Sequence, residues 1–210
     1  MQKDFDGLTK IDYSINRLKE HEPKDGYYLA FSGGKDSTVL YDLAVKFGVK
    51  FDAHYNRTGI DPPELVYFIR DYYPDVEFVR PKMSFWEGVR KNGLPTITQR
   101  WCCRYLKEHG VEGRRTATGV RAAESSRRAK GGIVRNCTRQ MGKKIVNPMF
   151  YWTDDEVWTY IRLRGLPYCG LYDEGFKRLG CILCPFAGDR KREMARWPKY
   201  FSALQGIIDD

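Results

Sequence analysis

Two hydrophobic periods alternate along the chain. Short apolar runs are typical of buried strands at residues 27–31, 51–56, 76–81 and 116–122. Apolar residues at helical spacing predict helices at residues 8–21, 64–73, 84–93, 100–110 and 153–165. A further stripe, typical of a helix packed on a sheet, consists of Val39, Leu40, Leu43 and Ala44. Because strands alternate with helices, we predict an α/β fold with a doubly wound, mainly parallel sheet.

The sequence also indicates helix ends and the position of a ligand cleft. Gly93, Gly110 and Gly165 stand where a glycine commonly closes a helix, and Thr153 and Glu156 have the spacing of a capping box. Ligands of such sheets bind beyond the carboxyl ends of the strands. We therefore expect one cleft to collect the segments 32–38, 57–59 and 119–125.

Composition narrows the class of protein. With 210 residues, 42% hydrophobic and 14% aromatic, the chain is long enough for a sizeable core. No apolar stretch approaches a membrane span, and the first residues lack the apolar core of a signal peptide. We therefore expect a cytoplasmic protein without a membrane partner. Thiols are reduced there, so six cysteines indicate metal binding or catalysis before disulfides.

The formal net charge of +9 allows two interpretations. Basic residues concentrate in residues 114–130 and 188–199. One interpretation is a basic surface with arginines that hold a small polyanion, and the other is a nucleic-acid footprint. We favour the first because no RNA- or DNA-binding motif accompanies the basic stretches.

A glycine loop joins the first strand to the next helix, with the sequence SGGKDST at residues 32–38. The start of a helix presents unpaired N–H groups and the positive end of its dipole. Gly33 and Gly34 let the backbone approach a ligand closely, so the junction predicts an anion site, most simply for a nucleotide phosphate. The spacing is neither that of a Walker A loop nor that of a Rossmann fingerprint.

This loop resembles the PP-loop of N-type ATP pyrophosphatases, in the adenine-nucleotide alpha-hydrolase superfamily. The resemblance implies that the β- and γ-phosphates of ATP are cradled by Ser32, Gly33, Gly34, Ser37 and Thr38. It also implies that Lys35 adds positive charge and that Asp36 places Mg²⁺ or anchors the loop.

Four of the cysteines form two pairs. Cys102 and Cys103 are adjacent, and Cys181 and Cys184 are separated by two residues. Four thiolates suit a tetrahedral Zn²⁺ or an iron–sulfur cluster, and an adjacent pair is awkward for zinc. The spacing and flanking residues resemble those of assimilatory adenylylsulfate (APS) reductases, which implies a [4Fe–4S] cluster on these four cysteines. Cys137 and Cys169 fit no pattern and are interpreted as free or buried thiols.

The segment GVRAAESSRRA resembles the G-x-R-x-x-E-S-x-x-R-A motif of the phosphoadenylylsulfate (PAPS) reductase-like family. The resemblance implies that Arg121 and one or both of Arg127 and Arg128 contact the substrate's phosphate or sulfate. It also implies that Gly119 belongs to the nucleotide-binding segment and that Glu124 orients an arginine or a metal ion. Thr58 and Gly59 match a family turn near the adenosine, although Arg57 replaces its usual acid.

The chain departs from the sulfonucleotide reductases in its chemistry. Those enzymes attack sulfur with a cysteine beyond the cluster region, and no cysteine follows Cys184 in this sequence. The loop also has the ATP-using form. We therefore predict an enzyme that cleaves ATP at the α-phosphorus and releases pyrophosphate in sulfur transfer, with Lys35, Asp36 and Arg121 as catalytic residues.

Two alternatives stay open. The first is an APS or PAPS reductase that makes sulfite, and the second is a nucleotide-binding iron–sulfur accessory subunit of a nucleic-acid-acting system. The expected cofactors are a [4Fe–4S] cluster, ATP and Mg²⁺. The expected partners are an adenine nucleotide, a sulfur donor or reductant protein, a nucleic acid acceptor and a second copy in a homodimer. We expect one domain over residues 1–210, with 150–210 as a helical and cluster-binding segment.

Overall fold

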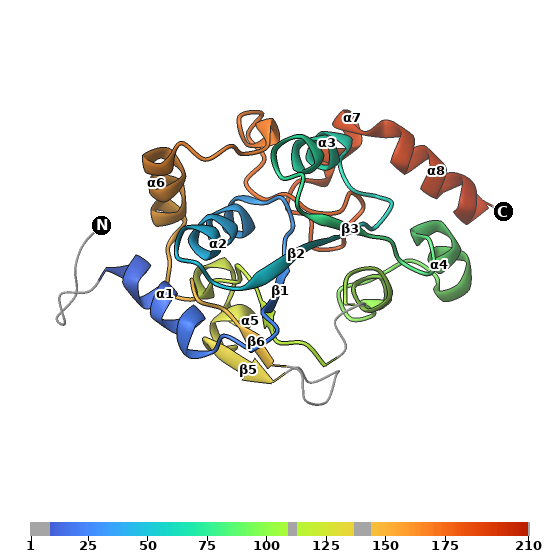
Figure 1. The fold of residues 1–210 in the computed structure, drawn as a ribbon. Coiled ribbons are helices and arrows are strands. Elements are labelled where there is room, and N and C mark those ends of the chain that lie inside the picture. The colour runs from blue at the N-terminus through green and yellow to red at the C-terminus, as the bar shows by residue number, and fades with distance from the viewer. Residues whose placement is uncertain (1–8, 109–112, 137–143, 210) are drawn as a thin grey trace. The chain divides into compact units, whose positions relative to one another are not determined.

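The computed structural model describes residues 9–108, 113–136 and 144–209. Within these residues, six strands form one sheet in the order β3-β2-β1-β4-β6-β5 (Figure 1). Their bounds are Tyr27–Ala30 (β1), Phe51–Asn56 (β2), Glu77–Val79 (β3), Thr116–Ala117 (β4), Val134–Asn136 (β5) and Lys144–Val146 (β6). β1 pairs in parallel with β2 and β4, β4 pairs in parallel with β6, and β5 runs antiparallel to β6. The predicted α/β class with a mainly parallel sheet is confirmed.

Five of the eight described α-helices follow the predicted apolar stripes, and no stripe was predicted for those at 126–129, 190–196 and 198–209. The eight helices are α1 (Lys10–Glu20), α2 (Lys35–Lys46), α3 (Pro63–Tyr72), α4 (Phe85–Asn92), α5 (Ser126–Ala129), α6 (Asp154–Arg164), α7 (Arg190–Arg196) and α8 (Pro198–Asp209). The Thr153–Glu156 capping box forms, and Gly165 closes α6 in the left-handed conformation at φ 60°. Gly93 closes α4, whereas the predicted end at Gly110 lies outside the described residues.

Two predicted elements differ in the structure. The expected strand 116–122 has only two residues, because the chain then leaves the sheet and Arg121 turns toward the carboxylates of Asp36 and Asp154. The expected helix 100–110 contains a π-helical turn at Cys103–Lys107 in place of a regular α-helix. Such turns widen the backbone and are frequent at functional sites.

Contacts divide the chain into two compact units. Unit 1 consists of Met1–Tyr55, Pro74–Glu77 and Val111–Tyr168, and unit 2 consists of Asn56–Tyr73, Phe78–Gly110 and Cys169–Asp210. The expectation of one domain with a C-terminal segment from residue 150 stays a prediction. No helix in the described parts of the chain is both long enough and apolar enough to cross a membrane.

Unit 1 is built around β1 and the helices that pack together beside it. α2 contacts both α1 and α6. Leu40 and Leu43 of α2 are fully buried, and the buried Trp152 donates from Nε1 to Ser14 Oγ at 2.9 Å. Burial of a large apolar side chain contributes about 1.5–3 kcal/mol, so this core fixes the start of α2 firmly.

Unit 2 has its own core. α3 contacts the short 3₁₀ helix Gly170–Tyr172, and α4 contacts α8. Trp101 packs over α4, where Gly88 leaves the room, because a Cβ there would stand 2.2 Å from the indole ring. Trp101 Nε1 donates to Gly93 O at 3.0 Å, which holds the segment before the cysteine pair on α4.

Candidate nucleotide and cysteine sites

The glycine loop ends β1 and opens α2 in unit 1. Gly33 has φ +70°, which favours glycine, and Gly34 is the N-cap of α2 with no side-chain cap hydrogen bond. Ser37 Oγ donates to Gly34 O at 2.8 Å and accepts from Ser32 N at 3.2 Å. The loop is therefore closed by its own hydroxyls, and the helix N-terminus is capped by no side chain, as an anion site requires.

Gly119 lies against the first turn of α2. A Cβ at this position would stand 2.9 Å from the backbone carbonyl carbon and oxygen of Asp36. Only glycine lets the segment after β4 approach so closely. The structure thus brings two sequence-predicted segments together, the glycine loop and the segment of Arg121.

Four charged side chains form a network behind the loop. Arg121 is 2% exposed and donates from Nε to Asp36 Oδ1 at 2.6 Å and from Nη2 to Asp154 Oδ1 at 2.8 Å. Lys35 is also buried, with its Nζ 3.0 Å from Asp154 Oδ1 and 3.5 Å from Asp36 Oδ2. Two cations therefore meet two carboxylates, and the group is neutral overall.

The pKa values show how strongly these charges depend on one another. Burial acts to lower the pKa of Arg121, but Asp36 and Asp154 outweigh it and raise that pKa. Burial acts to raise the pKa of Asp154, but Lys35 and then Arg121 lower it below its usual value. The pKa shifts of Arg121 and Asp154 both favour the charged forms, and the network locks the two segments to each other.

This arrangement bears on the roles of Lys35, Asp36 and Arg121. All three are engaged within the protein, so Asp36 is held as an anchor of the loop by Arg121. The contacts left for an anion are the backbone N–H groups at the start of α2 and the exposed Ser32. Sequence reasoning missed Asp154, and the capping box at Thr153 was the signal that could have located it at a helix start.

The remaining predicted residues of unit 1 lie beside this network. Glu124 accepts from Arg121 N at 2.9 Å and forms an ion pair with Arg128 Nη1. Arg127 is exposed on α5 and has no ion-pair partner among the described residues. Thr38 is buried, and its Oγ1 has no hydrogen-bond partner among the residues that the structure describes.

In unit 2, all four predicted cysteines line one cavity, together with apolar side chains such as Phe85 and Leu106. Cys102 and Cys103 reach it from the π-helical turn, and Cys181 and Cys184 reach it from a tight loop. In that loop Leu183 has φ +65°, a strained conformation for a leucine. Strain of this kind is retained where a site needs it, and here it lies between the two cysteines of the second pair.

Cations face the sulfur atoms of this cavity. Arg100 donates from Nη2 to Cys103 Sγ at 3.3 Å, and its guanidinium lies 4.8 Å from the centre of the Phe186 ring. The hydrogen bond from Cys102, assisted by Arg100, lowers the pKa of Cys103 to about 5. The pKa of Lys107 is raised, chiefly by the charge of Cys181. The pKa of Cys102 is raised, first by its hydrogen bond with Cys103, and burial raises the pKa of Cys181. The surroundings therefore favour a thiolate at Cys103.

Thr58 belongs to the same cavity. Its hydroxyl and backbone N–H both donate to Asp61, at 2.8 and 2.7 Å. Asp61 is buried, and sequence reasoning did not select it. Gly59 is exposed at φ +78° in the turn between them. The structure thus gives Thr58 a place beside the cysteines.

The other two cysteines differ from these four. Cys169 is 1% exposed, and burial raises the pKa of its thiol, which confirms the expectation of a free or buried thiol. Cys137 lies outside the described residues. Within the described residues, no three His, Cys, Asp or Glu side chains are grouped closely enough to ligate a single metal ion.

Comparison with known proteins shows the family of the chain. A model of the phosphoadenosine phosphosulfate reductase domain matches residues 26–187. The chain belongs to this family. The match contains the glycine loop, the Arg121 segment and all four cavity cysteines.

Relatives of two kinds are found. Two uncharacterized proteins of Methanocaldococcus jannaschii are 31% and 34% identical, over 86% and 99% of this chain. The chain spans about half the length of these relatives, with 41% and 55% of them covered. An adenosine 5′-phosphosulfate reductase of Staphylococcus haemolyticus is 27% identical, over 96% of this chain and 88% of its own length.

Two solved structures share the fold. The phosphoadenylyl-sulfate reductase of Candida auris has a TM-score of 0.60 at 19% identity, covering 86% of this chain and 97% of its own. The FMN adenylyltransferase of Candida glabrata in complex with ATP has a TM-score of 0.57 at 14% identity, covering 82% and 60%. At these identities the likeness is one of fold alone.

Proposed function

We propose that the chain is a sulfonucleotide reductase that releases sulfite from APS or PAPS. Relatives that match this chain over most of their length carry the name adenosine 5′-phosphosulfate reductase. This support favours the reductase over the ATP cleavage that the loop sequence first indicated. The observation that carries the proposal is the close packing of Gly119 and Arg121 on the first turn of α2, because it joins two segments suited to one anionic nucleotide.

The residues of unit 1 would bind and orient the nucleotide. The N–H groups at the start of α2 would receive its phosphate or sulfate oxygens, and Ser32 would add a hydroxyl. Lys35 and Arg121 are paired with Asp36 and Asp154 in a network that is neutral overall, so they would hold the loop in place for the anion. Arg127 has no ion-pair partner among the described residues and is available to an anion.

The four cavity cysteines fit a [4Fe–4S] cluster. Each cysteine of such a cluster ligates a different iron atom, so the sulfurs need not converge as tightly as the ligands of one Zn²⁺ ion. Arg100 and Lys107 would offset the negative charge of the thiolates. When bound, the cluster supplies an iron–sulfur centre whose potential depends on those charges and hydrogen bonds.

The reductase reaction needs a thiolate that attacks the sulfate sulfur, forming an S–S bond as the S–O bond to the nucleotide breaks. Cys169 is a poor candidate because it is buried and its pKa is raised. We assign this role to Cys137 or to the thiol of the donor itself. A second thiol would then release sulfite and leave a disulfide.

A second function is favoured by the loop itself. The loop has the sequence SGGKDS, and no side chain caps the N-terminus of α2 that follows it. Such a loop suits the pyrophosphate of ATP, and Mg²⁺ would enter together with the nucleotide. In that case the chain would release AMP and pyrophosphate in sulfur transfer to an acceptor such as nucleic acid. If the chain is instead an accessory subunit, it would bind the nucleotide without converting it to products.

One experiment separates these functions. Protein purified without oxygen, with its iron and sulfide counted, is incubated with APS or PAPS plus a reduced thiol donor, and separately with Mg-ATP. Sulfite from the first incubation supports the reductase, and Cys137→Ser then tests the nucleophile. Pyrophosphate from the second supports ATP cleavage. No product in either, with the cluster intact, overturns both and leaves the accessory role.

A further inference from the structure

The positive charge of the chain is concentrated in one stretch. Residues 125–153 contain seven lysines and arginines and no aspartate or glutamate, so this stretch supplies most of the net charge of +9. Its described part includes α5, β5 and β6 at one edge of the sheet (Figure 1). All three residues of β5 are exposed, as expected for an edge strand.

Several cations at this edge lack an acidic partner. Among the described residues, none forms an ion pair with Arg127, Lys130, Arg135 or Lys144. Some exposed arginines elsewhere pair, as Arg17 does with Glu20 at 2.7 Å and Arg164 with Asp42 at 3.1 Å, and others, such as Arg90, form no ion pair among the described residues. The edge is distinguished by the absence of aspartate and glutamate from residues 125–153. A protein surface normally intersperses its charges, so a single-sign edge indicates a partner of opposite charge.

The backbone places these cations at one edge of the sheet. Asn136 of β5 lies opposite Lys144 of β6, and Arg135 lies opposite Ile145. The Arg135 side chain returns toward the turn after α5, where its Cδ is 3.8 Å from the Cβ position of Gly131. Gly131 N donates to Arg128 O at 2.9 Å, which closes that turn. Because side chains alternate along a strand, Arg135 and Lys144 lie on opposite faces of this pair, so the positive residues flank the edge on both sides.

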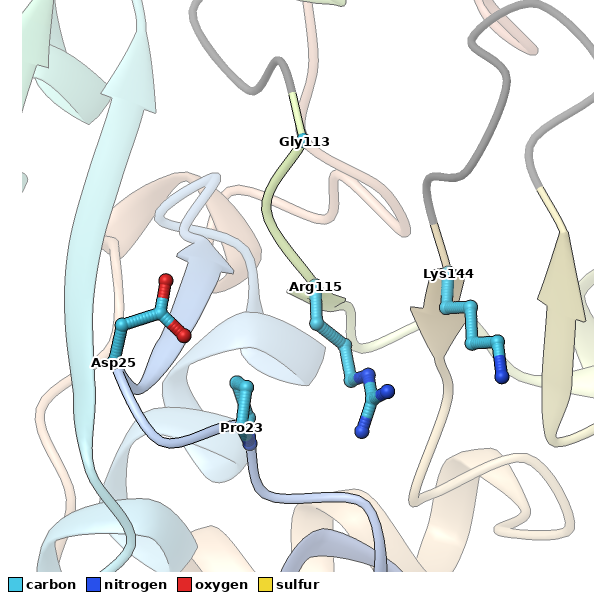
Figure 2. A pocket seen from close by; sticks show the side chains of 5 residues that line it. All are labelled: Pro23, Asp25, Gly113, Arg115 and Lys144. Atoms are coloured by element: carbon cyan, nitrogen blue, oxygen red, sulfur yellow. The ribbon is translucent and has the colours of Figure 1, made fainter.

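A cavity extends this edge at the amino ends of the parallel strands. It has a volume of about 170 Å³ and is lined by Pro23, Asp25, Gly113, Arg115 and Lys144 (Figure 2). Arg115 and Lys144 extend side by side, because Thr116 and Ile145 are register partners on the neighbouring strands β4 and β6. Arg115 donates from Nη1 to His21 O at 2.7 Å, which fixes the guanidinium at the cavity.

Simpler explanations account for less of this surface. One or two lysines are enough to protect an edge strand from pairing with another chain. A small anion would need only the cavity and not the cations of α5 and β5. An acidic protein partner usually also needs an apolar centre, and on the described α5, β5 and β6 the exposed large apolar side chain is Val134, at 39%.

We propose that this basic edge, formed by α5, β5, β6 and the cavity of Arg115 and Lys144, binds the phosphate backbone of a nucleic-acid strand. Cations that contact phosphates release counterions, so the binding is sequence-independent and weakens steeply with salt. Arg127 of α5 is also offered to the nucleotide of the glycine loop, so the test leaves that residue unchanged. The proposal does not depend on which nucleotide that loop binds.

The test uses the full chain and fluorescently labelled single-stranded RNA and DNA of mixed sequence, titrated at several salt concentrations. The variant Lys130→Gln/Arg135→Gln/Lys144→Gln removes three positive charges from the edge. Its control is Lys82→Gln/Arg90→Gln/Lys91→Gln, which removes three exposed charges around α4 in unit 2. Circular dichroism and thermal melting check that both variants fold.

We expect the edge variant to bind RNA or DNA about tenfold more weakly, with a salt slope smaller by about 2, since each phosphate contact on a single strand contributes roughly 0.7. The control should keep nearly the wild-type affinity and slope. The proposal is overturned if the wild type shows no salt-dependent binding or if both variants weaken equally. It is also overturned if labelled oligoglutamate binds as tightly as the nucleic acids, which would indicate an acidic protein partner.

Discussion

Arg121 and Asp36 are joined by a hydrogen bond of 2.6 Å from Nε to Oδ1, although 85 positions separate them in the chain. Arg121 is almost completely buried, and its other nitrogens reach Trp152 O and Asp154 Oδ1. A buried guanidinium is costly unless it is paired and hydrogen-bonded, and here each of its three nitrogens donates to a carboxylate or a carbonyl. This contact makes the glycine loop and the Arg121 segment one structural unit.

Replacing Arg121 should therefore destabilise unit 1 as well as weaken nucleotide binding. In Arg121→Ala, the loss should be about 3 kcal/mol, at the lower end for a broken buried pair, because Asp36 and Asp154 stay partly hydrated. Urea unfolding measures it. The control Arg164→Ala removes an exposed arginine that pairs with Asp42, and its effect should be small. Equal losses in the two variants would contradict a special role for Arg121.

Gly119→Ala tests the close approach of the two segments. The added Cβ would stand 2.9 Å from the Asp36 carbonyl, so the first turn of α2 must shift. We expect a stability loss of about 1–3 kcal/mol, typical of overpacking, together with weaker nucleotide binding. Gly170→Ala is the control, because its Cβ would meet no atom within 4 Å. Calorimetric titration measures the affinity for the nucleotide. An unchanged affinity in Gly119→Ala would contradict the importance of the close packing of the two segments.

The sequence predicted the loop and its flanking strand and helix because their signals are local. β1 and α2 carry continuous apolar periods, and the glycines between them mark a junction. The helix start at Thr153 was predicted from capping-box spacing, and the structure shows a second capping box, of Ser84 and Glu87, that the sequence analysis did not use. For these elements, local propensity and tertiary packing agree.

The parts that escaped prediction depend on long-range contacts. Asp154 is one of several acids at the start of α6, and only the fold brings it to Lys35 and Arg121. The strands β5 and β6 have three residues each, too few for a visible period. The π-helical turn at Cys103–Lys107 has no sequence signature of its own, because the spacing of its apolar residues predicts an ordinary α-helix.

The lowered pKa of Asp154 predicts a specific pH dependence. A carboxyl with a depressed folded pKa adds stability above its unfolded pKa of about 3.9, and this stability is lost as pH falls through the folded value. Asp154→Asn should therefore be less stable than wild type at pH 7, and the difference should shrink below about pH 4. Urea unfolding between pH 7 and pH 3 measures it.

Asp155→Asn supplies the matched control for this series. Asp155 lies at the same helix start, and no residue in the described part of the chain forms an ion pair with it. Its removal changes the charge near the helix dipole equally but leaves the network intact. If both variants followed the same pH curve, the dipole and not Lys35 and Arg121 would explain the effect.

The cysteine cavity makes the sharpest prediction about a cofactor. Cys103→Ala and Cys184→Ala each remove one cysteine sulfur from the cavity, so iron and sulfide per chain should fall close to zero after anaerobic purification. Cys169→Ala removes a buried thiol that lines no part of that cavity, so it should keep its iron while losing some stability. Iron-free wild-type protein, or iron retained in Cys184→Ala, would contradict a cluster on these four residues. Stoichiometric zinc in the wild type, lost in the same two variants, would assign the cavity to zinc.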